Sequence, residues 1–131
     1  MNEEYKPVIS FQAYRIEKFN YSKRESGEED EDNKFQVGVQ PGFDEEKKQA
    51  IITVNVKFIN NDVDIDIVVN GYFELQDGKT DNFTKYLVIN GTAILFPYIR
   101  SMISMLTSLD NENAILIPTI NTNSLWHENQ D

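Results

Sequence analysis

Apolar and polar residues alternate along much of the first half of the chain, which predicts a β-sheet. Residues 49–58 have a polar residue between most of the apolar ones, and residues 63–75 repeat the pattern. A period of two places alternate side chains on opposite faces of a strand. The triplet Asn60-Asn61-Asp62 between the two runs is typical of a turn. The pattern predicts an antiparallel hairpin whose apolar face carries Ala50, Ile52, Val54, Val56, Phe58, Val63, Ile65, Ile67, Val69, Gly71, Phe73 and Leu75.

Two more strands are predicted ahead of this hairpin. Phe35, Val37 and Val39 alternate with polar residues or glycine over a short run. Residues 8–22 are rich in β-branched and aromatic residues, but Tyr14 and Ile16 have the opposite parity to the apolar residues on either side. A β-bulge, which flips the facing of every later residue, and burial on both faces both explain this change. Four strands before any strong helical pattern are typical of an α+β fold with helices on one side of the sheet.

Residues 76–91 read as a turn and a crossover segment, and residues 92–109 read as a long helix. Thr92 is suited to cap its start, Pro97 is tolerated only in the first turn or at a kink, and Asp110-Asn111 ends the run. At about 100° per residue, one half of the helix is apolar. This half, which we expect to pack on the sheet, comprises Ile94, Leu95, Tyr98, Ile99, Met102, Ile103, Met105, Leu106 and Leu109.

The other half of the helix carries hydroxyl residues and one charge rather than the Lys and Glu of an ordinary surface helix. Serine and threonine are mediocre helix formers, but small side chains let a second helix approach closely. The chain offers no second long helix, so the partner helix would belong to another copy. The pattern therefore predicts a homo-oligomer with an interface at Arg100, Ser101, Ser104, Thr107 and Ser108.

Length and composition bound the class of protein. The 131 residues are one domain's worth of chain, and the absence of cysteine excludes disulfides and thiolate metal sites. The N-terminus lacks the pattern of a signal peptide, and no run approaches the roughly 18 apolar residues of a membrane span. We therefore expect a single soluble domain over residues 1–131, in the cytoplasm. The net charge of −10 disfavours nucleic acid and anionic membranes as partners.

Much of the excess acidity lies in an acidic loop at about residues 24–33, within "ESGEEDED", Glu25 to Asp32. Like charges at this density do not pack, so the run is either a solvated loop that keeps the protein soluble or a docking surface for a basic partner. A calcium loop fits poorly, because the run lacks the ligand spacing and central glycine of an EF-hand.

Residue combinations that support catalysis are scarce, and we expect neither an enzyme nor a cofactor or metal site. His127 is the single histidine and falls in a short C-terminal tail, residues 127–131. Asp64 and Asp66 share a strand face, where a polar surface opposite Lys57 is the simpler interpretation than a catalytic carboxylate pair.

Large apolar residues on irregular segments are more suggestive. They are either lids over the edge of the sheet or the lining of a groove that accepts apolar segments of other chains, where a few aromatic anchors can supply most of the affinity. These residues are Phe83, Tyr86, Leu87, Ile120, Leu125 and Trp126.

The C-terminal third resembles the bacterial export chaperone family SecB. The helix reads "ILFPYIRSMISML" and the segment after it "ILIPTINTNSLW". "FQAYRI", residues 11–16, is similar to the family's opening strand, and Gly71-Tyr72-Phe73 to the end of its fourth. The resemblance covers Ile9 to Trp126. The matching motif positions are Leu95, Phe96, Pro97, Tyr98, Arg100, Ile103, Ser104, Pro118, Ile120, Asn121, Leu125 and Trp126.

This resemblance implies a four-stranded antiparallel sheet with one long helix on one face, and a second C-terminal helix that is short or absent. It also implies a dimer of dimers with helices between two sheets. The implied activity is that of an ATP-independent holdase, which binds unfolded polypeptides without chemistry and hands them to the translocase motor SecA. The implied client groove would be lined by Phe83, Tyr86, Leu87, Tyr98, Ile120, Leu125 and Trp126.

The chain departs from the family at positions that matter for SecA. Of the acidic positions that contact SecA, Asp66 is retained, whereas Asn20 and Arg24 stand at two others. Two rival functions therefore stay open. One is a dedicated chaperone for a single partner, for example one associated with a toxin–antitoxin pair or one encoded by a phage, and the other is a non-chaperone oligomeric scaffold.

Overall fold

The computed structural model describes residues 9–24, 34–44, 48–75, 83–110 and 114–129, with no side chains from Trp126 onward. The acidic run Glu25 to Asp32 lies outside these residues. Of the predicted C-terminal tail, the backbone of residues 127–129 belongs to a helix.

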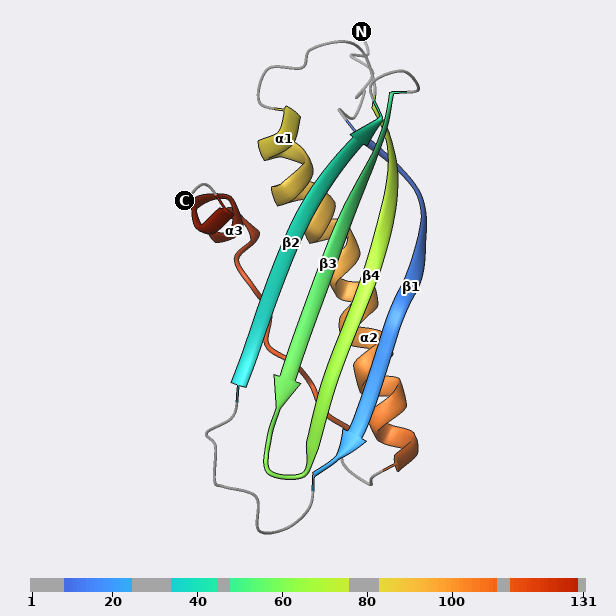
Figure 1. The fold of residues 1–131 in the computed structure, drawn as a ribbon, viewed down its shortest axis with the longest axis vertical. Helices are drawn as coiled ribbons and strands as arrows, with labels where there is room; N and C mark the ends of the chain where they lie inside the picture. Colours follow the sequence, from blue (N-terminus) through green and yellow to red (C-terminus); the bar gives the residue numbers. More distant parts are fainter. Residues whose placement is uncertain (1–8, 25–33, 45–47, 76–82, 111–113, 130–131) are drawn as a thin grey trace, which may run out of the picture.

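Four antiparallel strands form one sheet in the order β1-β4-β3-β2 (Figure 1). The strands are β1 (Ile9–Lys23), β2 (Lys34–Asp44), β3 (Gln49–Ile59) and β4 (Val63–Leu75). One long helix crosses a single face of the sheet and consists of α1 (Phe83–Tyr86), the π-turn η1 (Leu87–Gly91) and α2 (Thr92–Asp110). A short helix, α3 (Thr122–Asn129), follows. The α+β architecture predicted from the sequence is confirmed.

The β3–β4 hairpin has the predicted register and turn. Lys57 pairs with Asp66 across the strands. The side-chain oxygen of Asn60 accepts hydrogen bonds from the backbone N–H groups of Asp62 and Val63, both at 2.8 Å. This is the Asx-type turn that an asparagine in such a triplet favours. The predicted apolar face is the buried one, and it holds the centre of the core.

Strand β1 resolves the imperfect alternation of the first segment. Its register against β4 shifts twice, between Phe11 and Ala13 and between Ile16 and Lys18, so that Gln12 and Glu17 are extra residues. Each extra residue flips the facing of the strand. The register therefore puts residues of both parities opposite the core-facing positions of β4; these are Phe11, Tyr14, Ile16, Phe19 and Tyr21. The bulge explanation is confirmed twice over. Burial on both faces is wrong, since most of this edge strand is exposed.

The long helix begins nine residues earlier than predicted. Thr92 is an interior helical residue rather than a cap, with φ −66° and ψ −40°. Pro97 consequently lies in the middle of the helix, on its exposed side. Leu87, Val88 and Gly91 are buried, and this burial outweighs the turn-forming tendency of Asn90-Gly91. Part of the predicted crossover is therefore helix.

Gly71 of β4 leaves little space between the helix and the sheet. A methyl group built there would come within 3.2 Å of Leu95 Cδ2 on the helix and 3.3 Å of Ile52 Cγ2 on β3. By length and composition the helical stretch Phe83–Asp110 could cross a membrane, but 44% of its most apolar window is buried within the molecule. Its apolar side is that of a core helix packed on a sheet.

Candidate functional site

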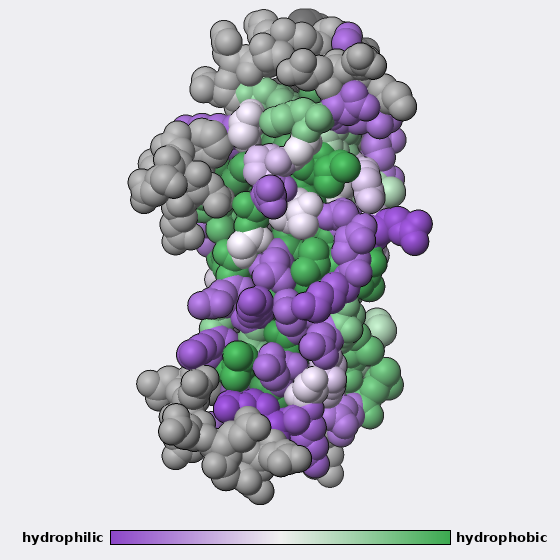
Figure 2. Space-filling model, in the orientation of Figure 1, coloured by the Kyte–Doolittle hydropathy of each residue, from purple (hydrophilic) through white to green (hydrophobic). Residues whose placement is uncertain are grey.

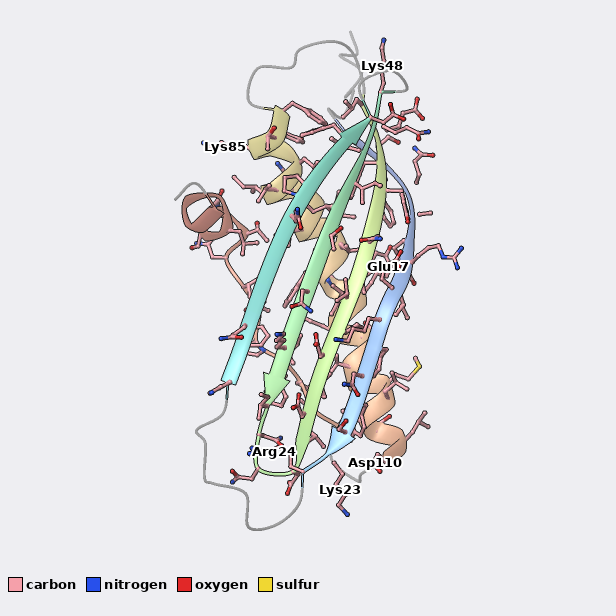
Figure 3. All side chains as sticks on the ribbon, in the orientation of Figure 1. Glu17, Lys23, Arg24, Lys48, Lys85 and Asp110 are labelled. Atoms are coloured by element: carbon pink, nitrogen blue, oxygen red, sulfur yellow. The ribbon has the colours of Figure 1, made fainter. Side chains whose placement is uncertain are left out.

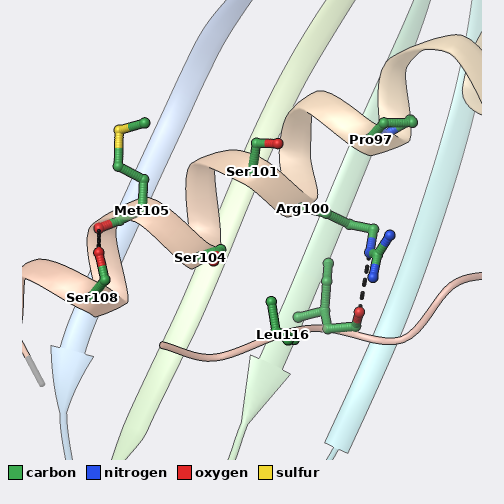
Figure 4. A pocket seen from close by; sticks show the side chains of 8 residues that line it. Pro97, Arg100, Ser101, Ser104, Met105, Ser108 and Leu116 are labelled. Atoms are coloured by element: carbon green, nitrogen blue, oxygen red, sulfur yellow. Dashed lines mark hydrogen bonds between the residues drawn. The ribbon is translucent and has the colours of Figure 1, made fainter. Parts of the chain in front are cut away.

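A groove runs along the side of α2 that faces away from the sheet. We call it the serine groove. It has a volume of about 540 Å³ and lies between α2 and the return segment, residues 114–121, which runs back along the helix (Figure 4). Its small hydroxyl side chains leave the space open. It is lined by Pro97, Arg100, Ser101, Ser104, Met105, Ser108, Leu116 and Ile117.

Two side chains of α2 fasten the return segment to the helix. Arg100 donates from Nε to the Ile117 carbonyl at 3.1 Å, and the Thr107 hydroxyl oxygen accepts from the Ile115 N–H at 2.8 Å. These two residues are seven positions apart, two turns along one side of the helix. Each therefore has a role within the chain that the sequence did not reveal.

The structure corrects the predicted placement of Thr107. Its side chain is only 1% exposed, and its hydroxyl lies within 2.8 Å of the Ile103 carbonyl and 3.1 Å of the Ser104 carbonyl. It does not line the serine groove. Ser101 and Ser108 are exposed and Ser104 is half-buried, so these three serines remain the open part of the predicted interface.

The predicted client-groove residues fall into two places. Phe83 packs on Phe43 of β2, with ring centroids 5.2 Å apart, whereas Tyr98 packs on Phe11 and Tyr14 of β1. The long helix thus separates Tyr98 from the rest of the set.

At the β2 end, most members of the set belong to the core. Leu87 is fully buried, and Phe83 and Leu125 are 7% and 6% exposed. Tyr86 is exposed and Ile120 is half-buried. Trp126 lies in α3, and η1 contacts both α3 and β2. The accessible members here are Tyr86 and Ile120, which we call the client surface, whereas Phe83, Leu87 and Leu125 are buried.

Beside η1 lies β2, which is an edge strand of the described sheet. The interior of β2, residues 35–43, carries no charge, and its eleven pairings with β3 continue without a bulge. The opposite edge, β1, has two bulges and the charged residues Arg15, Glu17 and Lys18. Bulges and charges are the devices that protect an edge strand from pairing with other chains. By this criterion β2 is the less protected edge.

A second exposed apolar surface, which sequence analysis missed, lies between β1 and α2. We call it the apolar flank. The rings of Tyr14 and Tyr98 pack there in a tilted arrangement with centroids 4.8 Å apart, and Ile16 is 49% exposed. Farther along, Leu106 and Leu109 form a notch with Phe19 and Tyr21. Green atoms gather along this margin beside β1 in Figure 2. The bulges of β1 hid this surface, because they bring residues of both parities to one face.

The Tyr21 hydroxyl closes the end of the apolar flank by donating a hydrogen bond to the Asp110 carboxylate at 2.7 Å. Partial burial, the hydrogen bond with Asp110 and the negative charge of that carboxylate together raise the pKa of Tyr21 to about 12. The phenol is therefore held protonated and acts as a tether between β1 and the end of α2.

The face of the sheet away from the helix is polar and internally hydrogen-bonded. Lys18 donates to Asp66 Oδ2 at 2.9 Å and Asn55 donates to Asp66 Oδ1 at 2.7 Å, so both carboxylate oxygens have partners. In a neighbouring row, Asn70 bonds Thr53 at 2.7 Å and Glu17 at 2.8 Å. Figure 2 shows the hydrophilic residues that cover this face, and Figure 3 shows Glu17 at its β1 margin.

Electrostatics around Asp66 favour the charged form. Partial burial raises the pKa of Asp66, but hydrogen bonds from Lys18 and Asn55 and the charges of Lys18 and Lys57 outweigh it, so the pKa lies below its ordinary value. This is a structural carboxylate on a polar face, in line with the simpler of the two interpretations of Asp64 and Asp66. Within the described part of the chain, no cluster of metal-ligating residues occurs.

Comparisons with known proteins agree with this architecture. A SecB-like chaperone of Mycobacterium tuberculosis, solved with a ChAD peptide from an antitoxin, superposes with a TM-score of 0.69 at 13% identity, covering 86% of this chain and 88% of that one. A protein of unknown function from Streptococcus agalactiae superposes with a TM-score of 0.57 at 18% identity, covering 85% and 97%.

In sequence, the chain is 26% identical over 125 residues to an uncharacterized protein of Methanocaldococcus jannaschii, covering 88% of this chain and 81% of that protein. The family model described as preprotein translocase subunit SecB matches residues 10–131. Because this match spans nearly the whole chain and the fold agrees with it, the protein belongs to the SecB family.

Proposed function

We propose that the protein is an ATP-independent holdase, which binds unfolded or non-native polypeptides in the cytoplasm and does no chemistry on them. Membership of a chaperone family supports this proposal. The observation that carries it is the position of the client surface, Tyr86 and Ile120, beside the uncharged edge of β2.

These two features suit an extended segment of another chain. An extended peptide can add to a free strand edge through backbone hydrogen bonds, which do not depend on sequence, while apolar side chains beside the edge accept alternate residues. Pro41 lacks an N–H, so we place the main contact on Phe35 to Val39, the part of β2 with all its donors. Such a site binds many sequences weakly.

Weak sites become effective when several act on one client. We propose that the protein is a homo-oligomer, and that the serine groove and the apolar flank are covered by sister chains. Exposed tyrosine, isoleucine and leucine on one flank support this, since monomers rarely expose a contiguous apolar surface of that kind. Several client surfaces on one particle then raise the effective concentration of each.

Delivery of clients to SecA is the finer proposal, and Asp66 bears on it. Both oxygens of this carboxylate are engaged by Lys18 and Asn55, and the side chain is 18% exposed. A SecA residue that contacts Asp66 must share its carboxylate with Lys18 or displace Lys18 from it. The positions of Asn20 and Arg24 offer SecA no additional carboxylate. The antitoxin peptide bound to the mycobacterial relative supports the second candidate, a chaperone dedicated to one client.

The test measures suppression of aggregation of several unrelated unfolded proteins at stoichiometric amounts of chaperone. The wild type should protect all of them, and Tyr86→Ser combined with Ile120→Ser should reduce protection several-fold. Ile51→Ser is the control, because Ile51 is as exposed as Tyr86, 37% in each case, but lies on the other face of the sheet. Protection of a single client favours the dedicated role, and protection of none rejects a holdase.

A further inference from the structure

The π-turn η1 is the irregular part of an otherwise regular helix, and it lies where the client surface is built. It interrupts the helix between α1, which carries Phe83 and Tyr86, and α2, which is packed on the sheet. It also contacts α3 and β2. A π-turn holds one residue more than the α-helical turn it replaces, and such turns are frequent at functional sites.

A buried hydroxyl directly after η1 has no hydrogen-bond partner among the residues that the structure describes. Thr92 is fully buried, and its Oγ1 bonds none of them. An unpaired buried hydroxyl costs about 1–3 kcal/mol. In a continuous α-helix, a threonine hydroxyl bonds a carbonyl three or four residues earlier, as the Thr107 hydroxyl is placed to do with Ile103 at 2.8 Å. For Thr92 the equivalent carbonyls belong to Val88 and Ile89, inside η1.

The helical segments on the two sides of η1 differ in how tightly they pack on the sheet. On the α2 side, Leu95 packs against Gly71 so closely that a methyl group there would lie 3.2 Å from it. On the other side, α1 has only four residues, of which Phe83 packs on Phe43 and Tyr86 is exposed. A change of the π-turn into a regular turn must therefore be taken up by α1. It would rotate α1 by roughly 100° and move it about 1.5 Å along the axis, the contribution of one helical residue.

We propose that η1 is a joint with two settings, which re-aims α1 when a client binds. In the free setting the π-turn is present and Thr92 is unpaired. In the client-bound setting the helix is continuous, Thr92 Oγ1 donates to Val88 or Ile89, and Phe83 and Tyr86 point in new directions. The bond gained by Thr92 offsets part of the cost of moving α1, so a weakly binding client suffices to shift the equilibrium. This inference rests on the proposed function for its ligand.

The joint can be tested by the distance between two spin labels. The chain has no cysteine, so labels attach only at Lys85→Cys on α1 and Gln49→Cys on β3, a strand outside the proposed client contact. Both residues are exposed, and Lys85 projects away from the sheet (Figure 3). Labelled protein is mixed with excess unlabelled protein, so that distances within one chain dominate. The client probe is reduced, carboxymethylated α-lactalbumin, and its binding is measured in the same sample by gel filtration.

Three variants give matched readings. The wild type should show a second distance, shifted by several ångströms, that grows when the probe binds. Thr92→Val cannot make the new bond and should keep the first distance with or without probe. Deletion of Ile89 removes the extra residue, so the helix becomes continuous with α1 left in its first position, and this variant should keep the first distance with or without probe.

The outcomes distinguish failure of the joint from failure of the holdase proposal. A single wild-type distance that stays unchanged while the probe is bound overturns the joint and leaves the holdase standing. If the probe does not bind, the holdase proposal fails, and the free protein decides the joint. When no probe binds, the joint is overturned if the wild type and Thr92→Val both show one and the same label distance. This outcome does not depend on whether the deletion variant folds.

Discussion

The hydroxyl oxygen of Thr107 accepts a hydrogen bond from the backbone N–H of Ile115 at 2.8 Å. One threonine thereby ties the long helix to the segment that returns along it. Fifteen positions earlier, Thr92 is equally buried but its hydroxyl bonds nothing. The two residues are the same in type and burial and differ in hydrogen bonding, so they form a natural pair for mutation.

Thr107→Val should destabilise the protein, whereas Thr92→Val should be neutral or stabilising. Valine has nearly the shape of threonine, so the comparison isolates the hydroxyl group. Thr107→Val leaves the Ile115 N–H without its partner, at a cost of about 1–3 kcal/mol, and Thr92→Val removes an unpaired group. Urea unfolding at neutral pH measures both. Equal losses in the two variants would contradict the assigned hydrogen bonds.

Gly71→Ala should cost about 1–3 kcal/mol of unfolding free energy, because the added methyl group overpacks the contact between Leu95 and Ile52. Gly38 is the matched control. It also lies in a strand, but nothing approaches a methyl group there within 4 Å. Gly38→Ala should gain about 0.5–1 kcal/mol, because alanine loses less conformational freedom on folding. A loss of stability in both variants would point to backbone effects instead of packing.

Because of Asp66, the free energy of unfolding should decrease as the solution becomes more acidic. Its folded pKa lies below the ordinary value of 3.8, so its contribution is present above pH 3.8 and is lost as the pH falls through the folded pKa. Asp66→Asn removes this dependence, and Lys18→Met weakens it by deleting the main partner. Urea unfolding at a series of pH values from 6 to 3 measures the slopes. Additive effects in the double variant would show that the two side chains do not interact.

Tyr21 should act at the opposite end of the pH scale. Its pKa rises from 10.0 to about 12 on folding, so the folded state holds the proton more tightly. The contribution is complete below pH 10 and is lost as the pH rises towards 12. In Tyr21→Phe, the free energy of unfolding should fall less steeply as the pH rises from 10 to about 12. Ultraviolet titration of the phenolate provides the independent check, since the wild type should show a transition near pH 12 that Tyr21→Phe lacks.

Sequence reasoning predicted the sheet and the main helix because their apolar faces are long and periodic. It missed the start of the helix, since Asn90-Gly91 is turn chemistry that only the packing of Leu87 and Val88 on the sheet overrides. It offered a bulge in β1 as one explanation without locating it, because one parity change is compatible with several registers. The two extra residues become visible only against β4.

The site was harder to predict than the fold. Phe83, Leu87 and Leu125 were interpreted as groove lining because large apolar residues on irregular segments look exposed, yet they lie on helices and in the core. Thr107 was grouped with the serines because a helical wheel shows direction and not distance. It could not show that the return segment would cover that one turn.

The paired bulges of β1 affect how relatives of this protein should be compared. Removing Gln12 alone would turn the residues before it to the wrong side of the sheet, and removing Glu17 alone would do so for everything up to Ile16. Losing both restores the facing at each end while inverting the stretch between them. An alignment that places a gap here by letter similarity alone can therefore exchange inward and outward positions. Gaps in this strand should be placed by the side of the sheet that each residue occupies.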